Sequence, residues 1–154
     1  MFKLLASIEI AAPRETVFAC YCDPGTWQEA LPSLVALEML NDPPFGLGTR
    51  WRQRRRLLWM TDESEIEVTA FEAPERIEYQ VHNAKLTAEG GTLYLADHMA
   101  EAEGSTVWSV GVSIRMPQPM PAWVEWLFVT PMRWGARRDL RAFKRYIERR
   151  ATQR

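Results

Sequence analysis

Three side chains in the middle of the chain could together move protons or hold the polar end of a ligand. Arg55, Tyr79 and Asp97 offer a permanent cation, a phenol and a carboxylate. An arginine and a phenol can polarise a carbonyl group, and a carboxylate can accept or return a proton. We therefore take these three as the candidate catalytic residues, on the condition that the fold brings them to one side of one sheet.

Other reactive residue types form no recognisable site. Neither His82 nor His98 has a carboxylate at a ligand-like helical spacing, so we expect no metal site. Cys20 and Cys22 are two apart, which is not the spacing of a redox motif or the start of a disulfide framework. The Gly-Leu-Gly at 46–48 is not followed by the lysine of a phosphate loop. The sequence thus predicts no cofactor.

The elements that would position Arg55, Tyr79 and Asp97 are antiparallel strands. Alternation of apolar and polar residues, the period of a half-buried strand, runs through most of the chain after residue 49. Before it, we expect a short strand and two short helices that are separated by the Asp-Pro-Gly at 23–25. The expected strands cover 6–10, 34–40, 50–60, 63–71, 76–82, 92–102 and 106–116, whereas 83–91 could be a loop or a continued strand.

The first long hairpin decides whether Arg55 faces inward. A two-residue turn at 61–62 would pair Arg56 with Glu67 and place one face of the hairpin in water. The opposite face would hold Trp51, Gln53, Arg55 and Leu57 beside Ile66, Val68 and Ala70. Burial of that face continues into the next strand through Ile77, Tyr79 and Val81.

In the last hairpin, the side chains that demand burial determine the inward face. Trp108, Val110, Val112 and Ile114 alternate, and their cross-strand partners must turn inward with them. Those partners are Leu93, Leu95, Asp97 and Met99. Both histidines then point outward.

The C-terminal segment predicts one long helix over residues 121–150. Ala136, Leu140, Phe143 and Ile147 recur at helical spacing and form an apolar face. Pro131 and Gly135 lie inside the helix, so we expect a kink or a break there. The bulky apolar residues at its start, Trp123 and Leu127 among them, would close the space above the sheet.

Parts of the sequence resemble one superfamily. Residues 8–18 (IEIAAPRETVF), then Asp23 and Trp27, then residues 46–50 (GLGTR) are similar to the SRPBCC or START-like superfamily. It includes polyketide cyclase/dehydrase-like proteins, lipid-transfer domains and coenzyme-Q-binding proteins. The resemblance covers nearly the whole chain and implies a single α+β domain over residues 1–154 with the helix-grip fold. In that fold a curved seven-stranded antiparallel sheet wraps around the C-terminal helix and leaves a large apolar cavity.

A hollow core changes the meaning of the inward polar residues. In a solid core a buried charge without a partner would cost several kcal/mol, whereas in a cavity wall it can orient a ligand. The predicted ligand-binding residues are Trp51, Gln53, Arg55, Tyr79, Leu95, Asp97, Met99, Trp108, Trp123 and Leu127. Two other interpretations stay open: an internal salt bridge between Arg55 and Asp97, or a different register that places both in solvent.

The net charge of −1 conceals two regions of opposite sign. Residues 1–132 hold 10 basic and 18 acidic side chains, and residues 133–154 hold 9 and 2. A basic helix after a tryptophan-rich segment could contact a membrane surface or another protein. Nucleic-acid binding is not expected, because there is neither a reading motif nor a net positive domain. With no signal peptide or membrane span, we expect a cytoplasmic monomer or homodimer.

Three functions follow from the sequence. The first is binding of a hydrophobic or aromatic small molecule, such as a lipid, a polyketide or a quinone-like compound, in the cavity. The second is a polyketide cyclase/dehydrase-type enzyme in which Arg55 and Tyr79 polarise a carbonyl and Asp97 moves a proton. The third is docking on a partner or membrane through the tryptophan-rich final helix.

Overall fold

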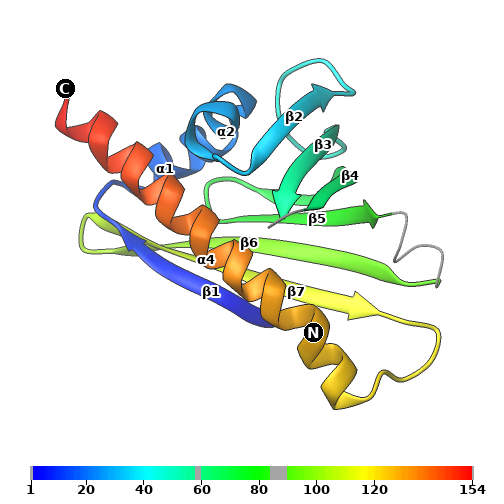
Figure 1. The fold of residues 1–154 in the computed structure, drawn as a ribbon. Helices are drawn as coiled ribbons and strands as arrows, with labels where there is room; N and C mark the ends of the chain where they lie inside the picture. The colour runs from blue at the N-terminus through cyan, green and yellow to red at the C-terminus, as the bar shows by residue number, and fades with distance from the viewer. Residues whose placement is uncertain (1, 58–59, 84–89, 154) are drawn as a thin grey trace.

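The structure is a computed structural model that describes residues 2–57, 60–83 and 90–153. Its elements, labelled in Figure 1, are β1 (Lys3–Ile10), α1 (Arg14–Tyr21), α2 (Pro24–Ala30), β2 (Leu34–Met39), β3 (Arg50–Leu57), β4 (Met60–Glu72), β5 (Arg76–Asn83), β6 (Thr92–Ala102), β7 (Ser105–Arg115) and α4 (Ala122–Thr152). Proline at the first position of α2 and the Asp23 side chain, which accepts from the Gly25 N–H at 3.0 Å, explain why α2 starts where it does.

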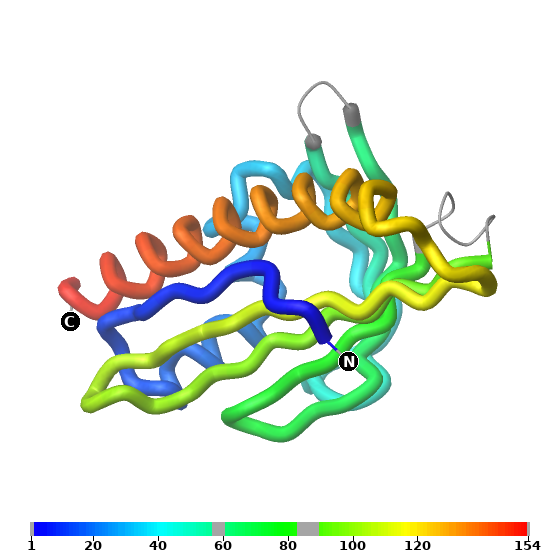
Figure 2. The backbone as a smooth tube through the Cα atoms, turned by 90° about the horizontal axis from the view of Figure 1, so that it is seen from below, coloured from blue at the N-terminus to red at the C-terminus, as the bar shows by residue number. Residues whose placement is uncertain are grey.

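The seven strands form one antiparallel sheet in the order β1-β7-β6-β5-β4-β3-β2. The chain passes directly from each strand to its neighbour from β2 to β7, and β1 joins the far side of β7. Helix α4 runs along β1 and lies across one face of the curved sheet, as the two perpendicular views show (Figures 1 and 2). The predicted helix-grip fold is therefore confirmed.

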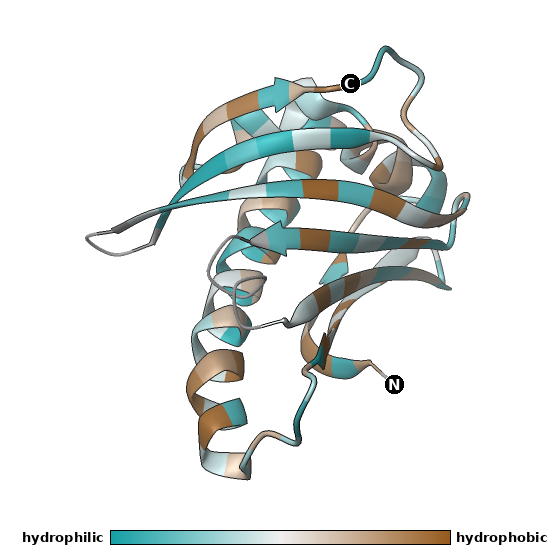
Figure 3. Ribbon diagram, turned by 90° about the vertical axis from the view of Figure 1, so that its right-hand side faces the viewer, coloured by the Kyte–Doolittle hydropathy of each residue, from teal (hydrophilic) through white to brown (hydrophobic). Residues whose placement is uncertain are grey.

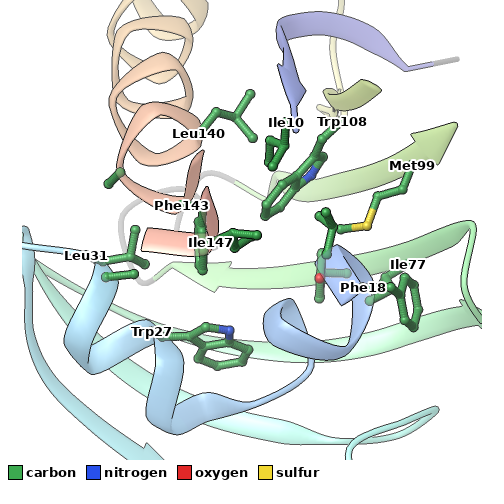
Figure 4. Close-up of a cluster of buried hydrophobic side chains, with 14 of the residues drawn as sticks. Ile10, Phe18, Trp27, Leu31, Ile77, Met99, Trp108, Leu140, Phe143 and Ile147 are labelled. Atoms are coloured by element: carbon green, nitrogen blue, oxygen red, sulfur yellow. The ribbon is translucent and has the colours of Figure 1, made fainter. Parts of the chain in front are cut away.

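One apolar cluster joins the C-terminal half of α4 to the sheet and to the two short helices. Leu140, Phe143 and Ile147 of α4 are buried against Trp108 of β7 and Trp27 of α2 (Figure 4). These are the helix residues whose spacing predicted an apolar face. A smaller cluster of Leu5, Val112 and Val129 holds the first half of α4.

The β6–β7 hairpin has the predicted register. Met99 pairs with Trp108 and Asp97 with Val110, so Asp97 faces the helix while His98 is exposed. The turn is the two residues Glu103 and Gly104, both at positive φ, as a hairpin turn of this length requires. Ser105, expected in the turn, pairs with Ala102 instead.

The predicted register of the β3–β4 hairpin is wrong. Arg56 pairs with Thr61, not with Glu67, and the expected turn residues at 61–62 belong to β4. Leu57 pairs with Met60, and residues 58–59 between them lie outside the described residues. The observed register stabilises the sheet because it sets Arg54 opposite Glu63 and Arg52 opposite Glu65, each pair within ion-pair distance. The slip is an even number of residues, so Trp51, Gln53 and Arg55 still face inward.

A bulge in β4 changes which residue near its end faces the core. The register with β5 shifts between Val68 and Ala70, which exchanges the faces of the residues that follow. Phe71 rather than Ala70 therefore meets the core, and its ring lies 5.5 Å from that of Phe18.

Helix α4 has no break. It continues as one helix through Pro131 and Gly135, so of the predicted kink or break, the break is wrong. Pro131 removes only the hydrogen bond to the carbonyl of Leu127, and the side chains of Leu127 and Pro131 are both exposed, so water can satisfy that carbonyl. Residues 83–91 were expected to be a loop or a continued strand. The structure ends β5 at Asn83 and starts β6 at Thr92, and 84–89 lie outside the described residues.

Among the described helices, none has an apolar stretch long enough to cross a bilayer.

Candidate functional site

A cavity of about 770 Å³ lies between the sheet and α4. Strands β3 to β7 contribute its floor, α2 one end, and residues 130–143 of α4 its other wall. The lining is mainly aromatic and aliphatic. The rings of Trp27 and Trp51 are 4.7 Å apart, and Trp51 also contacts Tyr79 at 5.7 Å, so these aromatic side chains form a continuous wall.

Seven of the ten predicted ligand-binding residues line this cavity: Trp51, Gln53, Arg55, Tyr79, Leu95, Asp97 and Trp108. The other three do not. Met99 faces inward but belongs to the solid part of the core with Ile77 and Phe18. Trp123 and Leu127 lie on the outer surface of α4, where 67% and 53% of their areas are exposed.

Arg55 has a partner that the sequence analysis did not identify. Its Nη2 donates to both carboxylate oxygens of Asp139 on α4, at 2.7 and 2.8 Å, and to the Ser33 hydroxyl at 2.7 Å. The alternative of an Arg55–Asp97 salt bridge is therefore wrong. Burial raises the pKa of Asp139, and the nearby Arg55 opposes that shift. A signal existed in the sequence: Asp139 is one of only two acids in the basic C-terminal region, next to the buried Leu140.

A second polar group lies on the cavity wall and consists of Tyr79, Tyr21, Asp97 and Trp108. The Tyr79 hydroxyl donates to the Tyr21 hydroxyl at 2.5 Å, and Tyr21 donates to Asp97 Oδ2 at 2.9 Å. The Trp108 indole N–H donates to the other carboxylate oxygen at 2.7 Å. We call this set the tyrosine–aspartate chain.

The tyrosine–aspartate chain lies in an environment that resists charge. Burial raises the pKa of Asp97 from 3.8 to about 6, although the hydrogen bonds from Trp108 and Tyr21 lower it. Burial, followed by the neighbouring Asp97, raises the pKa of Tyr21 well above its ordinary value. Burial likewise raises the pKa of Tyr79. Both tyrosines are therefore neutral donors near neutral pH, and Asp97 is the group that can titrate.

The three candidate catalytic residues do not meet at one point. Tyr79 and Asp97 are joined through Tyr21, whereas Arg55 is bonded to Asp139 and Ser33. The sequence analysis did not place Tyr21 in the site. Its signal was chemical: a buried tyrosine needs a partner for its hydroxyl, and Asp97 was the inward carboxylate without one.

Comparison with known families agrees with the fold. The family model described as "Polyketide cyclase / dehydrase and lipid transport" matches residues 1–148. The chain belongs to this family. No curated protein sequence matches it significantly.

Solved structures of the polyketide cyclase/dehydrase and lipid transport type of fold resemble the chain closely in shape. The Zhui aromatase/cyclase from a Streptomyces species has a TM-score of 0.74 and 12% identity, covering 98% of this chain and 96% of that one. A START superfamily protein from Mycobacterium smegmatis has a TM-score of 0.72 and 13% identity, with 94% and 95% covered. Norcoclaurine synthase from Thalictrum flavum, in complex with dopamine and hydroxybenzaldehyde, has a TM-score of 0.72 and 16% identity, with 97% and 88% covered. At these identities the likeness shows the shared fold alone.

Proposed function

We propose that this chain binds a hydrophobic small molecule, at least partly aromatic, in the cavity between the sheet and α4. The observation that carries the proposal is an aromatic-walled space of about 770 Å³ that has polar groups at only a few places. Its size and lining are those of small-molecule sites in general. The family description names lipid transport, and norcoclaurine synthase, which shares the fold, holds two small aromatic molecules, dopamine and hydroxybenzaldehyde.

Binding has more support than a cyclase/dehydrase-type reaction. That reaction, as we envisaged it, needs Arg55 and Tyr79 on one carbonyl, with Asp97 in reach of the same substrate. Arg55 is instead held by Asp139 and Ser33. The wall that a ligand meets is mainly apolar and aromatic, with the tyrosine–aspartate chain among its polar groups.

Filling the cavity from α4 is expected to abolish binding without loss of the fold. Gly135 lines the cavity, and a Cβ placed there meets nothing within 4 Å. Gly135→Trp should weaken binding of the apolar probe N-phenyl-1-naphthylamine by about tenfold or more, because the indole occupies the probe's space. Probe fluorescence and quenching of tryptophan emission give the affinity.

Gly135→Ala is the matched control. It should bind the probe like the wild type and raise stability by about 0.5–1 kcal/mol, since alanine favours a helix interior over glycine. If Gly135→Trp folds and binds the probe as tightly as Gly135→Ala does, the probe is not in this cavity and the proposal is wrong.

A second proposed function is docking on an anionic lipid surface through the outer face of α4. Trp123, Trp126, Leu127, Phe128 and Trp134 are all about half exposed or more. Figure 3 shows hydrophobic residues concentrated in the first turns of this helix. Tryptophan and other large apolar side chains at this density suit the boundary between lipid headgroups and acyl chains.

The charge that follows the tryptophans selects an anionic partner. Arg137, Arg138, Arg141 and Arg145 are exposed and, within the described part of the chain, form no ion pair. The three acids of α4 are already paired: Glu125 with Lys3, Asp139 with Arg55 and Glu148 with Lys144. The outer face therefore presents aromatic surface followed by uncompensated positive charge, which complements anionic headgroups.

Vesicle binding tests the lipid docking surface. Wild-type protein should float with vesicles of equimolar phosphatidylcholine and phosphatidylglycerol, and Trp126→Ala combined with Arg141→Gln should reduce binding by about tenfold or more. Phe2→Ala, which removes an exposed aromatic side chain from outside α4, is the control. Equal binding to pure phosphatidylcholine would contradict the role of charge. If the wild type self-associates in size exclusion, the double variant does not, and neither protein binds vesicles, the surface binds a second copy of the chain instead.

A further inference from the structure

The hydrogens of the tyrosine–aspartate chain all point one way. With Asp97 ionised, Tyr79 donates to Tyr21, and Tyr21 and Trp108 donate to the two carboxylate oxygens. A tyrosine hydroxyl has one hydrogen to give and can accept further hydrogen bonds. The chain therefore has no O–H left for a ligand, and what it offers at its outer end is the lone pairs of Tyr79.

Tyr79, whose oxygen carries these lone pairs, lies on the wall of the cavity. Among the described residues no group donates a hydrogen bond to its oxygen. Two other polar side chains of the wall are already engaged: Gln53 accepts from the Trp51 indole at 3.2 Å, and Arg55 is bonded to Asp139. A buried acceptor without a donor is unfavourable, so a ligand that supplies the donor is favoured.

We infer that this cavity selects ligands that carry a phenol or an alcohol, whose O–H donates to the Tyr79 oxygen. The inference rests on the proposed binding function and specifies the class of ligand. An ether or ketone of the same shape would bring only its own lone pairs to this point. Sites that satisfy a substrate hydroxyl reject the analogue that lacks it, because buried polar atoms are then left unpaired.

Protonation of Asp97 reverses the direction of the hydrogen bonds in the tyrosine–aspartate chain. A proton taken from solution onto Asp97 Oδ2 can be donated to the Tyr21 oxygen, after which Tyr21 donates to Tyr79 and the Tyr79 O–H is free to point into the cavity. The outer end then donates, and it suits a ketone or aldehyde. The covalent O–H bonds of both tyrosines stay intact, and only the direction of their hydrogen bonds changes.

Of Asp97 and the groups that surround it, Asp97 is the one that titrates in the pH range of the binding assays. The surrounding groups are Tyr21, Tyr79, Trp108, Cys22 and, farther off, Asp139. The tyrosines remain neutral there, and burial raises the pKa of Cys22 to about 12. The charge of Asp139 is shared with Arg55. Asp97, whose pKa is about 6, therefore changes the direction of the chain between mildly acidic and mildly basic solution.

Three naphthalenes that differ in one substituent test the inference. 2-Naphthol donates, whereas 2-methoxynaphthalene and 2-acetonaphthone only accept, and each can displace N-phenyl-1-naphthylamine from the cavity. Near pH 7.5, wild type should bind 2-naphthol about fivefold or more tightly than the two acceptors. Near pH 5 the preference should shift toward 2-acetonaphthone.

Two variants separate the chain from general packing. Tyr79→Phe should bind all three compounds with similar affinity at both pH values. Asp97→Asn places an N–H donor beside the Tyr21 oxygen, as protonated Asp97 does, so Tyr21 should donate to Tyr79 and the freed Tyr79 O–H should favour 2-acetonaphthone at both pH values. Thermal melts confirm that each variant folds, and Asp97→Asn keeps the test valid if Tyr79→Phe does not fold.

The outcomes distinguish the two proposals. If neither the fluorescent probe nor any naphthalene binds the wild type, the binding function itself is wrong. If all bind, but with the same order of affinity in wild type and in Asp97→Asn at both pH values, binding stands and the selection of hydroxyl ligands is overturned.

Discussion

Trp108→Ala is expected to lower the free energy of unfolding by about 4 kcal/mol, the usual cost of deleting a fully buried tryptophan. The Trp108 side chain is 1% exposed and contacts Tyr21 and Phe143 at ring distances of 4.8 and 5.2 Å. Its loss leaves a void and also removes the indole donor from Asp97. Urea denaturation followed by circular dichroism measures the change.

The control for Trp108→Ala is the same substitution on the outer face of α4. Trp126 is 64% exposed, so Trp126→Ala should change the unfolding free energy by less than about 0.5 kcal/mol. Equal losses in the two variants would contradict the placement of Trp108 in the core and Trp126 on the surface.

The contribution of Asp97 to stability should fall as pH rises from about 4 to about 6, and Asp97→Asn should lack this contribution. The pKa of Asp97 is raised from 3.8 to about 6 by burial, so the folded protein holds the proton more tightly than the unfolded chain does. The resulting stabilisation is complete below the unfolded pKa and is lost as pH passes the folded pKa. A shift of this size corresponds to about 3 kcal/mol.

The pH effect is measured as a difference between two proteins. Asparagine keeps the shape of Asp97 and an oxygen that can accept from Trp108, but it does not titrate in this range. Other shifted groups, such as Asp139, Glu65 and Glu148, contribute equally to both proteins and cancel. Parallel plots of unfolding free energy against pH for wild type and Asp97→Asn would contradict the assignment.

The alternation of side chains predicted the cavity wall well. The face on which a side chain lies depends on whether its position along the strand is odd or even (its parity), and an even shift of the pairing leaves it unchanged. The β3–β4 hairpin was misaligned by six residues, yet Trp51, Gln53 and Arg55 kept their inward faces, since an even slip preserves them. Where parity itself changed, the prediction failed: the bulge near Val68 turned Phe71 inward in place of Ala70. A bulge adds one residue with little sequence signal, so alternation alone could not show it.

Partners across the fold were the harder part of the site. Arg55 and Asp97 share the inward face of the sheet, but each bonds to a residue from a helix: Arg55 to Asp139 and Asp97 to Tyr21. Strand pairing is local and regular, whereas the position of a helix above a sheet depends on packing that no sequence period records. The sequence therefore predicted the wall of the cavity but not the hydrogen bonds that close it.

Pro131, which cannot donate a backbone hydrogen bond, divides α4 into two halves that differ in the free energy of local unfolding. After Pro131, Leu140, Phe143 and Ile147 are buried, and Asp139 is tied to Arg55. Before it, Val129 is the buried side chain of the helix, and Trp123, Trp126 and Leu127 are exposed. Local opening follows the least anchored segment. Local opening of α4 is therefore expected to begin in its first half, while the second half stays packed on most of the core.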